Sequence, residues 1–408
     1  MRIPLVAAIL MSSALVAVEP GLPWSRTFDA VPAFDAAAGF GSVPLATGDR
    51  TTTDIPRGSR FDLRVRPGAY RVEVVVDAGG KAGTVSVMAE LRRLMARAVA
   101  IPAAGTATVR FQVDVRDPQV PGLGEVRRNP RELANESVAW DDRLTIYLLG
   151  EEVRLRAITV TPITVPIIYL AGDSTVADQP FDPYASWGQM LPVFLDEGVV
   201  VANHAQSGST VRSFLAEHRF AKILSRITAG DHLLIQFGHN DMKDRTPGAV
   251  ERFATELTGV IRQAQGQGAS VTLLTSMERH RFVQGRTQET LGAYPATVRR
   301  VAATTGCALV DLHSMSRTLY ETLGEAGSSR LFKPAGPGDR DFDHTHHSTF
   351  GAYEIARCVC QGLAHVGHPL ARHLRPGVVP FDPAHPDDPA AVVVPLSSLP
   401  APTRPLGD

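Results

Sequence analysis

Four short polar segments of this chain carry the residue types that acyl transfer requires. They cover residues 172–175, 203–209, 238–241 and 343–346. A serine hydroxyl is a weak nucleophile until a neighbouring base accepts its proton, and a carboxylate that holds the base in the correct tautomer completes the set. Within these segments Ser174 is the candidate nucleophile and His346 the candidate base. Asp343, three residues before His346, is the carboxylate that would orient it.

A tetrahedral oxyanion also needs hydrogen-bond donors that are already in place. The candidates for such an oxyanion hole are the backbone N–H groups of Ser174 and Gly208 and the side-chain amide of Asn240. Singly these signals are weak, because glycine, asparagine and a Gly-Asp-Ser turn are all common in ordinary turns. Together, the four segments are far more specific for a serine hydrolase site than any one of them.

A second interpretation of the last segment is a metal site. His344, His346 and His347 lie close together in the chain, and zinc favours histidine and carboxylate ligands. Adjacent side chains such as those of His346 and His347 diverge, however, and a closed zinc site needs further ligands at suitable spacing. We therefore predict no bound metal and no organic cofactor. On the metal interpretation, loss of His344 would be as damaging as loss of His346.

The elements that position these segments are predicted from hydrophobic periodicity. In the second half of the chain, near-continuous apolar runs alternate with helix-like segments, which is typical of a parallel sheet buried on both faces. Ligands bind beyond the carboxyl ends of such strands, so the polar segments are expected to converge there. The predicted strands are residues 167–171, 199–202, 233–237, 271–275 and 308–312, and a helix is predicted over 249–265, with Thr246 as N-cap and Pro247 first.

Residues 60–162 show a different pattern, in which apolar and polar residues alternate over short runs separated by turn residues. This pattern predicts half-buried antiparallel strands, and several of them at regular spacing predict a β-sandwich. The predicted strands are residues 61–65, 70–76, 84–88, 108–115, 144–149 and 153–160.

The two ends of the chain fit neither pattern. Residues 1–18 combine one positive charge, at Arg2, with an apolar run too short for a comfortable membrane span. This predicts a secretory signal peptide, with a buried N-terminal helix as the alternative. The proline-rich end predicts a loosely structured strap or a disordered tail. The predicted division is a signal peptide at 1–18, a β-sandwich at 19–163, a catalytic domain at 164–374 and a tail at 375–408, in a secreted or periplasmic protein.

Composition excludes several classes of protein. The formal net charge of -1 argues against a basic nucleic-acid-binding protein and against a polybasic membrane surface. No segment after the predicted signal is long and apolar enough to span a bilayer. Only three cysteines are present, so the fold must rest on its hydrophobic core and not on a disulfide framework. Oligomeric state leaves no signal in the sequence.

The motifs resemble the four blocks of the SGNH/GDSL hydrolase superfamily, with Ser174, Gly208, Asn240, and Asp343 with His346 in the family's order. Over about residues 165–363 the chain is similar, more narrowly, to the rhamnogalacturonan acetylesterases of carbohydrate esterase family 12. The all-β half resembles the galactose-binding-like sandwich of some bacterial relatives. The supporting segments are residues 170–176, 186–192, 202–208, 235–241 and 343–346.

This resemblance implies an α/β, flavodoxin-like three-layer fold with a parallel sheet, preceded by an all-β galactose-binding-like sandwich. It implies a serine esterase that removes acetyl groups from galacturonic acid residues of pectic rhamnogalacturonan. The reaction would pass through an acetyl-enzyme intermediate and need no cofactor. The expected partner is an acetylated polysaccharide, with no nucleic acid and, after signal cleavage, no membrane.

Some positions depart from the family pattern or have two interpretations. Thr175 replaces the Leu for which the superfamily is named, although Thr is common in this branch. Ser209 stands where many relatives have an Arg, so the contact that such an Arg could make to an acidic sugar is not expected here. Tyr184 and Trp187 are candidates for stacking on a sugar, or they are structural aromatics. His347 is a candidate substrate contact, or it caps the following helix.

Motifs at a reaction centre do not identify the leaving group, because loops recognise it. An acetylxylan esterase, a sialate O-acetylesterase and a small-lipid acyl hydrolase are therefore alternatives. A non-catalytic carbohydrate-binding protein, whose sandwich does the recognition, is an alternative from another class. The sandwich itself either binds glycan or only packs against the catalytic domain.

Overall fold

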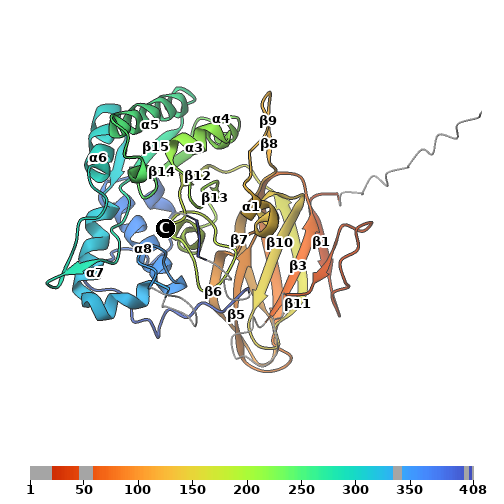
Figure 1. The fold of residues 1–408 in the computed structure, drawn as a ribbon. Helices are drawn as coiled ribbons and strands as arrows, with labels where there is room; N and C mark the ends of the chain where they lie inside the picture. Colours follow the sequence, from red (N-terminus) through yellow and green to blue (C-terminus); the bar gives the residue numbers. More distant parts are fainter. Residues whose placement is uncertain (1–20, 46–57, 334–341, 399–403, 407–408) are drawn as a thin grey trace, which may run out of the picture.

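A computed structural model of the chain describes residues 21–45, 58–333, 342–398 and 404–406. These residues form two units that lie side by side, an all-β unit and an α/β unit (Figure 1). The signal peptide predicted at residues 1–18 lies outside the described residues. Within the described part of the chain, no helix is long and apolar enough to cross a membrane.

The all-β unit is a sandwich of two antiparallel sheets, with strand orders β1-β11-β4-β7 and β2-β3-β10-β5-β6. Strand β4 alternates buried with more exposed side chains, because one face of its sheet packs on the other sheet, whereas β5 and β10 are buried along most of their length. In β4, Val72, Val74 and Val76 are fully buried and the side chains between them are not. The bounds are β1 Trp24–Thr27, β2 Phe40–Val43, β3 Gly58–Arg64, β4 Gly68–Asp77, β5 Gly83–Ala89, β6 Arg93–Ile101, β7 Ala107–Val115, β10 Arg143–Leu149 and β11 Arg154–Pro162, with a small hairpin of β8 Gln119–Val120 and β9 Gly124–Glu125.

The second unit contains a five-stranded parallel sheet with the order β13-β12-β14-β15-β18. Numbered within this unit the order is 2-1-3-4-5, which is the flavodoxin-like arrangement, and it changes direction between β12 and β14. The predicted fold, a flavodoxin-like unit after a β-sandwich, is thus confirmed. The bounds are β12 Ile167–Gly172, β13 Val200–Asn203, β14 His232–Gln236, β15 Ser270–Leu274 and β18 Ala308–Val310, with a two-stranded ribbon of β16 Phe282–Val283 and β17 Arg286–Thr287.

Helices cover both faces of the parallel sheet and complete the three layers. Helices α3 to α6 share a hydrophobic core with one face, and α2, α7 and α8 share a core with the other. The strands between them are therefore buried on both sides, which explains their continuous apolar runs. The bounds are α2 Trp187–Met190, α3 Val211–Ala216, α4 Arg219–Leu224, α5 Ala249–Gly266, α6 Tyr294–Thr305, α7 Leu312–Ser328 and α8 Thr349–His365, with α1 Pro130–Asn135 before β10.

The start of α5 differs from the prediction. The helix begins at Ala249, and the residue before it is Gly248 with φ 76°, so Thr246 is not the N-cap. The Thr246 hydroxyl donates instead to Asp244 Oδ1, 2.5 Å away. A left-handed turn at Gly248 brings the chain into the helix, and glycine adopts that conformation without the steric cost of a Cβ.

The two units are in contact, and the C-terminal segment reaches both. β7 of the sandwich lies against β13 at the edge of the parallel sheet, and β6 lies against α2. Residues 375–398, part of the predicted tail at 375–408, contain no helix or strand. In this segment, Ala391 O accepts a hydrogen bond from Arg97 of the sandwich (2.8 Å), and Ser398 Oγ accepts one from the backbone N–H of Asp182 (2.7 Å).

Candidate active site

Ser174 lies in the turn that follows β12, where the strand order changes direction. The neighbouring Asp173 holds this turn in shape, because its Oδ1 accepts hydrogen bonds from the Thr175 backbone N–H (3.0 Å) and hydroxyl (2.7 Å). The strand ends at Gly172, where a Cβ would lie 2.5 Å from the side chain of Val176. The glycine therefore lets the chain fold back tightly and place the serine at the end of the strand.

His346 lies between Ser174 and Asp343. Its Nε2 is 2.8 Å from Ser174 Oγ, and its Nδ1 is 3.1 Å from Asp343 Oδ2. The other carboxylate oxygen of Asp343 accepts the backbone N–H groups of His346 (2.9 Å) and Thr345 (3.0 Å), so the acid is fixed before α8 begins. The three side chains are at most 2% exposed. The structure thus brings together the predicted nucleophile, base and orienting carboxylate in one chain of contacts.

The charge on Asp343 is maintained by its partners. Burial alone would raise the pKa of this carboxyl group, but the hydrogen bond and charge of His346 and the two backbone N–H groups lower it well below its ordinary value of 3.8. Asp343 is therefore a carboxylate at neutral pH. A carboxylate on Nδ1 leaves Nε2 as the acceptor that faces the serine hydroxyl, and it stabilises the imidazolium that forms when His346 takes a proton.

The predicted oxyanion donors lie at the ends of the two strands that flank β12. Gly208 follows β13 and has φ 83°, a left-handed conformation that favours glycine. Asn240 follows β14, and its Nδ2 donates one hydrogen to Ser209 O (3.1 Å), so a second amide hydrogen is left for another acceptor. Within the described part of the chain, no acceptor takes the backbone N–H of Ser174 or Gly208. These donors are the kind that a developing oxyanion requires.

A polar cavity of about 460 Å³ adjoins these donors. Its wall combines side chains from both units, because Asn129, which caps α1, faces the cavity together with Gly208 and Asn240. Lys243 also lines it and donates to Asn240 Oδ1 at 3.3 Å. A space of this kind suits a polar ligand better than an apolar one.

The residues suggested for substrate contact are buried. Trp187 is 1% exposed and donates its indole N–H to Gln236 Oε1 (2.9 Å). His347 is also 1% exposed; its Nε2 is 2.9 Å from the Tyr320 hydroxyl. Tyr184 is 2% exposed and meets the His346 ring edge-to-face, with ring centroids 6.0 Å apart. The position of Trp187 supports the structural interpretation. His347 does not cap α8, because the N-cap is Ser348. Tyr184 packs directly on the candidate base.

The three neighbouring histidines do not converge on one point. His346 Nε2 faces Ser174, whereas His347 Nε2 faces Tyr320 and His344 Nδ1 is 2.6 Å from the backbone oxygen of His280. A metal ion needs ligand atoms directed at a common centre. The geometry therefore favours the hydrolytic interpretation of this segment over the metal interpretation.

Another buried imidazole supports the serine turn, and the sequence motifs did not assign it a role. His239 follows β14; its Nδ1 is 3.3 Å from Asp173 Oδ2 and its Nε2 is 2.8 Å from Met277 O. Burial raises the pKa of Asp173, but the charge and hydrogen bond of His239 outweigh it, so the pKa is lowered overall. Asp173 is adjacent to Ser174 in the sequence, and His239 is adjacent to Asn240. This adjacency is the signal from which a supporting role could have been predicted.

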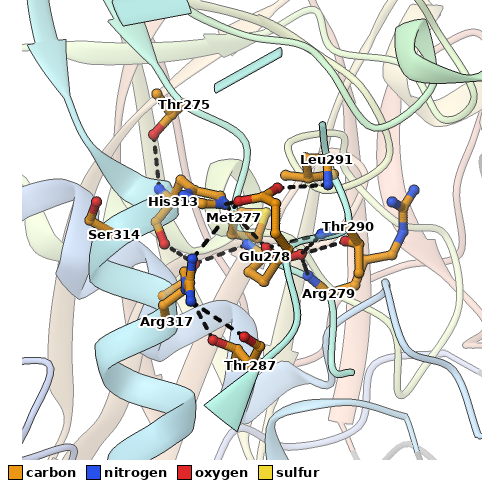
Figure 2. Close-up of polar contacts among 12 residues, drawn as sticks. Thr275, Met277, Glu278, Arg279, Thr287, Thr290, Leu291, His313, Ser314 and Arg317 are labelled. Atoms are coloured by element: carbon orange, nitrogen blue, oxygen red, sulfur yellow. Dashed lines mark hydrogen bonds and ion pairs between the residues drawn. The ribbon is translucent and has the colours of Figure 1, made fainter. Parts of the chain in front are cut away.

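A polar cluster at the end of β15 anchors the segment that carries Met277. Figure 2 shows Glu278 between the Thr290 segment and the start of α7, with Arg279 beside it. The Glu278 carboxylate accepts from the Arg279 backbone N–H (2.8 Å) and lies 3.1 Å from His313 Nε2. The Arg279 guanidinium donates in turn to Thr345 Oγ1 (3.1 Å), between Asp343 and His346. The cluster therefore links the β15 end to the turn that carries the candidate base.

The same cluster contains ligand types that metals use. One atom each from Glu278, Glu289 and His313 lies within 4.8 Å of the others. However, Arg317 is 3.8 Å from Glu289 Oε2, and His313 Nε2 lies at hydrogen-bonding distance from both carboxylates. The carboxylates thus already have hydrogen-bonding and ion-pair partners within the protein, so the cluster is explained as an internal support.

Comparisons with known proteins agree with this geometry. A model of the GDSL-like Lipase/Acylhydrolase family matches residues 170–347. Rhamnogalacturonan acetylesterase RhgT of Bacillus subtilis is 40% identical over 216 residues, which cover 51% of this chain and 93% of that protein. The probable rhamnogalacturonan acetylesterase YesY of the same organism is 30% identical over 212 residues, 51% of this chain and 96% of YesY. A rhamnogalacturonan acetylesterase of Emericella nidulans is 28% identical over 225 residues, 48% of this chain and 86% of its own length.

Proposed function

The chain belongs to the GDSL-like lipase/acylhydrolase family and is a carboxylic ester hydrolase, and we propose that it removes acetyl groups from rhamnogalacturonan. The observation that carries the chemistry is the unbroken contact from Ser174 Oγ through His346 to Asp343, at 2.8 and 3.1 Å. Nucleophile, base and orienting carboxylate are the parts that a serine esterase needs. Their relative positions need no rearrangement for proton transfer.

In the proposed mechanism, His346 Nε2 accepts the hydroxyl proton as Ser174 Oγ bonds to the acetyl carbonyl carbon. The carbonyl oxygen becomes an oxyanion, and the Ser174 and Gly208 N–H groups with the Asn240 amide stabilise it. His346 then gives the proton to the sugar oxygen as the C–O bond breaks, which leaves the acetyl group on Ser174. Water attacks this acetyl-enzyme with His346 again as base, so acetate is released and the serine is regenerated.

The substrate class rests on the relatives. RhgT and the Emericella enzyme are named rhamnogalacturonan acetylesterases, and RhgT is 40% identical to this chain over almost all of its own length. The polar cavity beside Gly208 and Asn240, with Lys243 in its wall, suits an acetylated, acidic polysaccharide. Such a polymer is met outside the cell, so we propose that the protein acts after secretion, which agrees with the signal peptide predicted at residues 1–18.

The test is acetate release from acetylated rhamnogalacturonan and, in parallel, from acetylated xylan, with Ser174→Ala as the control. We expect faster release from the pectic polymer and none above background from the variant. Release mainly from xylan would leave the chemistry in place and replace the substrate. No release from either polymer by folded protein would overturn the polysaccharide assignment and direct the search to small acetyl esters.

A further inference from the structure

We propose that the β-sandwich supplies positioning residues for the esterase nucleophile, through the three buried arginines Arg92, Arg93 and Arg116, called here the interface arginines. The inference rests on the proposed esterase function and deepens it. Each of these side chains is at most 4% exposed. Each crosses from the sandwich into the α/β unit, where its partners belong to the segment that follows β12 or to the end of β13.

Arg92 makes the most direct of these contacts. It donates to the backbone oxygens of Gln179 (2.8 Å) and Tyr184 (3.3 Å), and it pairs with the Asp182 carboxylate. All three partners lie in the segment that runs from Ser174 to α2. One guanidinium therefore fixes three points of the segment that leaves the nucleophile. The guanidinium can make these contacts because it is planar and has five N–H donors. A lysine, with a single ammonium group, cannot reproduce them.

The turn that presents Arg92 has an unusual backbone. Between β5 and β6, Glu90 has φ 54° and Arg92 has φ 60°. Residues other than glycine rarely adopt this left-handed region, because Cβ meets the backbone there. Such a conformation persists only where surrounding contacts hold it. Here the contacts are those that Arg92 makes with the α/β unit and those that Glu90 makes with Thr145 of β10.

Gln179 connects Arg92 with the nucleophile. Its backbone oxygen accepts from Arg92, while its side-chain amide donates to Ser174 O (2.7 Å) and to Ser207 Oγ (3.2 Å). Ser207 precedes Gly208, a predicted oxyanion donor. A displacement of Gln179 would thus move the serine and one side of the oxyanion hole together. Its backbone oxygen is also held by Gln189 Nε2 (3.1 Å), which reaches the Leu91 backbone oxygen of the sandwich turn (3.0 Å).

Arg93 and Arg116 hold the same region from the other side. Arg93 Nε is 3.2 Å from Asp178 Oδ2, and Arg116 donates to the backbone oxygen of Asn203. The Asn203 side chain bridges the two, because its Nδ2 donates to Asp178 Oδ1 (2.7 Å) and to Val176 O (2.8 Å). The segment after Ser174 is therefore fastened to the sandwich by permanently charged groups at both of its ends.

The expected consequence is kinetic. A displacement of about 1 Å at a nucleophile can cost about 10²-fold in turnover, since attack needs near-contact geometry. The sandwich would then be required for the rate of the chemical step and not only for binding the polymer. A glycan-binding role would instead change KM for the polymer and leave kcat unchanged.

The experiment uses the full chain and p-nitrophenyl acetate, so that it does not depend on which polysaccharide is the substrate. Concentrations of competent Ser174 are measured with a fluorophosphonate reagent that labels the active serine, and kcat is expressed per labelled site. We expect Arg92→Lys to lower this kcat by about 10–100-fold with KM within about twofold. The matched control is Arg97→Gln. Arg97 also leaves the sandwich, to Ala391 O of the C-terminal segment and to the Tyr353 ring of α8, but it touches nothing in the Ser174 segment. The kcat of this variant should therefore stay within about twofold.

A double-variant cycle tests whether the effect passes through Gln179. Gln179→Met should lower kcat by a similar factor, and Arg92→Lys should then add little, since both changes break the same link. Unchanged kcat in Arg92→Lys, or losses that simply multiply, would overturn the proposal. If Arg92→Lys does not fold, Gln179→Met decides alone, and unchanged kcat would overturn it. Turnover of the small ester without acetate release from any polysaccharide would contradict only the proposed substrate.

Discussion

Two regions of this molecule that bury ionisable side chains differ in whether a proton can move. At the active site, Ser174, His346 and Asp343 form a chain in which the imidazole can gain and lose a proton. At the contact between the units, the cations are guanidinium groups such as those of Arg92 and Arg93, which are paired with the carboxylates of Asp182 and Asp178. Burial lowers the pKa of Arg116 to about 10, yet the group remains charged at neutral pH. The first region suits chemistry, and the second suits holding segments in fixed positions.

The largest effect on turnover should follow from removing Ser174, which donates the proton, or His346, which accepts it. Ser174→Ala and His346→Ala should each lower turnover by about 10⁶-fold, because nucleophile and base act as one unit. The measurement is kcat for a small acetyl ester, with the unfolding midpoint measured beside it. Each variant should keep a folded structure, since Ser174→Ala loses one side-chain hydrogen bond and His346→Ala loses two.

His344→Ala is the matched control for His346→Ala. His344 stands two residues earlier, but its Nδ1 contacts the backbone oxygen of His280 and not Ser174. We expect turnover within about tenfold of the parent protein, because only one hydrogen bond at the edge of the site is lost. Equal losses at the two positions would contradict the assignment of His346 as base and favour a metal site.

The second prediction concerns a buried charge in the contact between the units. One of its partners, Glu217, lies in the wall of the polar cavity, but none lies in the Ser174 segment. Arg219, at the start of α4, is 1% exposed and pairs with the fully buried Glu132 of α1 at 2.6 Å. Arg219→Met should reduce the free energy of unfolding by about 3–5 kcal/mol, because a carboxylate is left without its partner in a dry environment. Urea denaturation gives the stability, and kcat per labelled serine should remain close to that of the parent.

The second change Glu132→Gln sharpens this result. A glutamine keeps an oxygen for the Asn129 backbone N–H, which Glu132 now accepts at 2.9 Å, but removes the unpaired charge. The double variant should therefore recover a large part of the lost stability. A large loss of kcat in Arg219→Met would show that every interface charge affects the site, and the distinction between Arg92 and Arg219 would fail.

The third prediction returns to the site and to a fixed donor. Asn240→Ala should lower kcat by about 10²–10³-fold, because the amide stabilises the oxyanion only in the transition state. The control is Lys243→Met, which removes the 3.3 Å contact to Asn240 Oδ1 and keeps the amide. Its loss of kcat should be less than about tenfold. Lower stability of Asn240→Ala with unchanged kcat would remove Asn240 from the oxyanion role.

The two regions also differ in how far their sequence predicts them. The five parallel strands have continuous apolar runs because both faces are covered, and each predicted strand lies within three residues of the observed one at either end. The segments at their ends could then be assigned to one edge of the sheet. Asp343 and His346 are three residues apart, so their pairing is a local property of a turn and follows from spacing alone.

The interface arginines have no such signal. Their partners named above lie 85 to 92 residues away in the chain, and that pairing depends on how two units pack. For the same reason β6, Arg93–Ile101, was not predicted as a strand. Its first three residues are all buried, because Arg93 and Leu94 face the α/β unit and Met95 faces the core of the sandwich. The alternation that marks a half-buried strand is therefore lost. The burial of Trp187 likewise comes from tertiary packing and has no local mark.

The smallest expected effect is a change of stability with pH, caused by the titration of a carboxyl group at the site. Asp241, next to Asn240, accepts the Val211 backbone N–H through Oδ1 (2.9 Å), and its Oδ2 is buried without a partner within the described residues. Burial, with a smaller contribution from the charge of Asp173, raises the pKa of Asp241 from 3.8 to about 7. The native state therefore holds this proton more tightly than the unfolded chain does. Stability falls as the pH rises through this range, by about 1.4 kcal/mol between pH 6 and pH 8.

Asp241→Asn should remove this part of the pH dependence, because an amide does not titrate and keeps an oxygen for the Val211 N–H. Urea denaturation of parent and variant at pH 6, 7 and 8 measures the difference in slope, which isolates Asp241 from other groups that titrate nearby in pH. Asp244→Asn is the control: its hydrogen bonds with Thr246 lower its pKa to about 2, so it is ionised in both states and adds no slope. If Asp241→Asn kept the full dependence of the unfolding free energy on pH, a group other than Asp241 would be responsible for it. The dependence of stability on pH could instead disappear in a variant of an interface arginine and persist in Asp241→Asn. That result would reverse the division between a titrating site and a permanently charged interface.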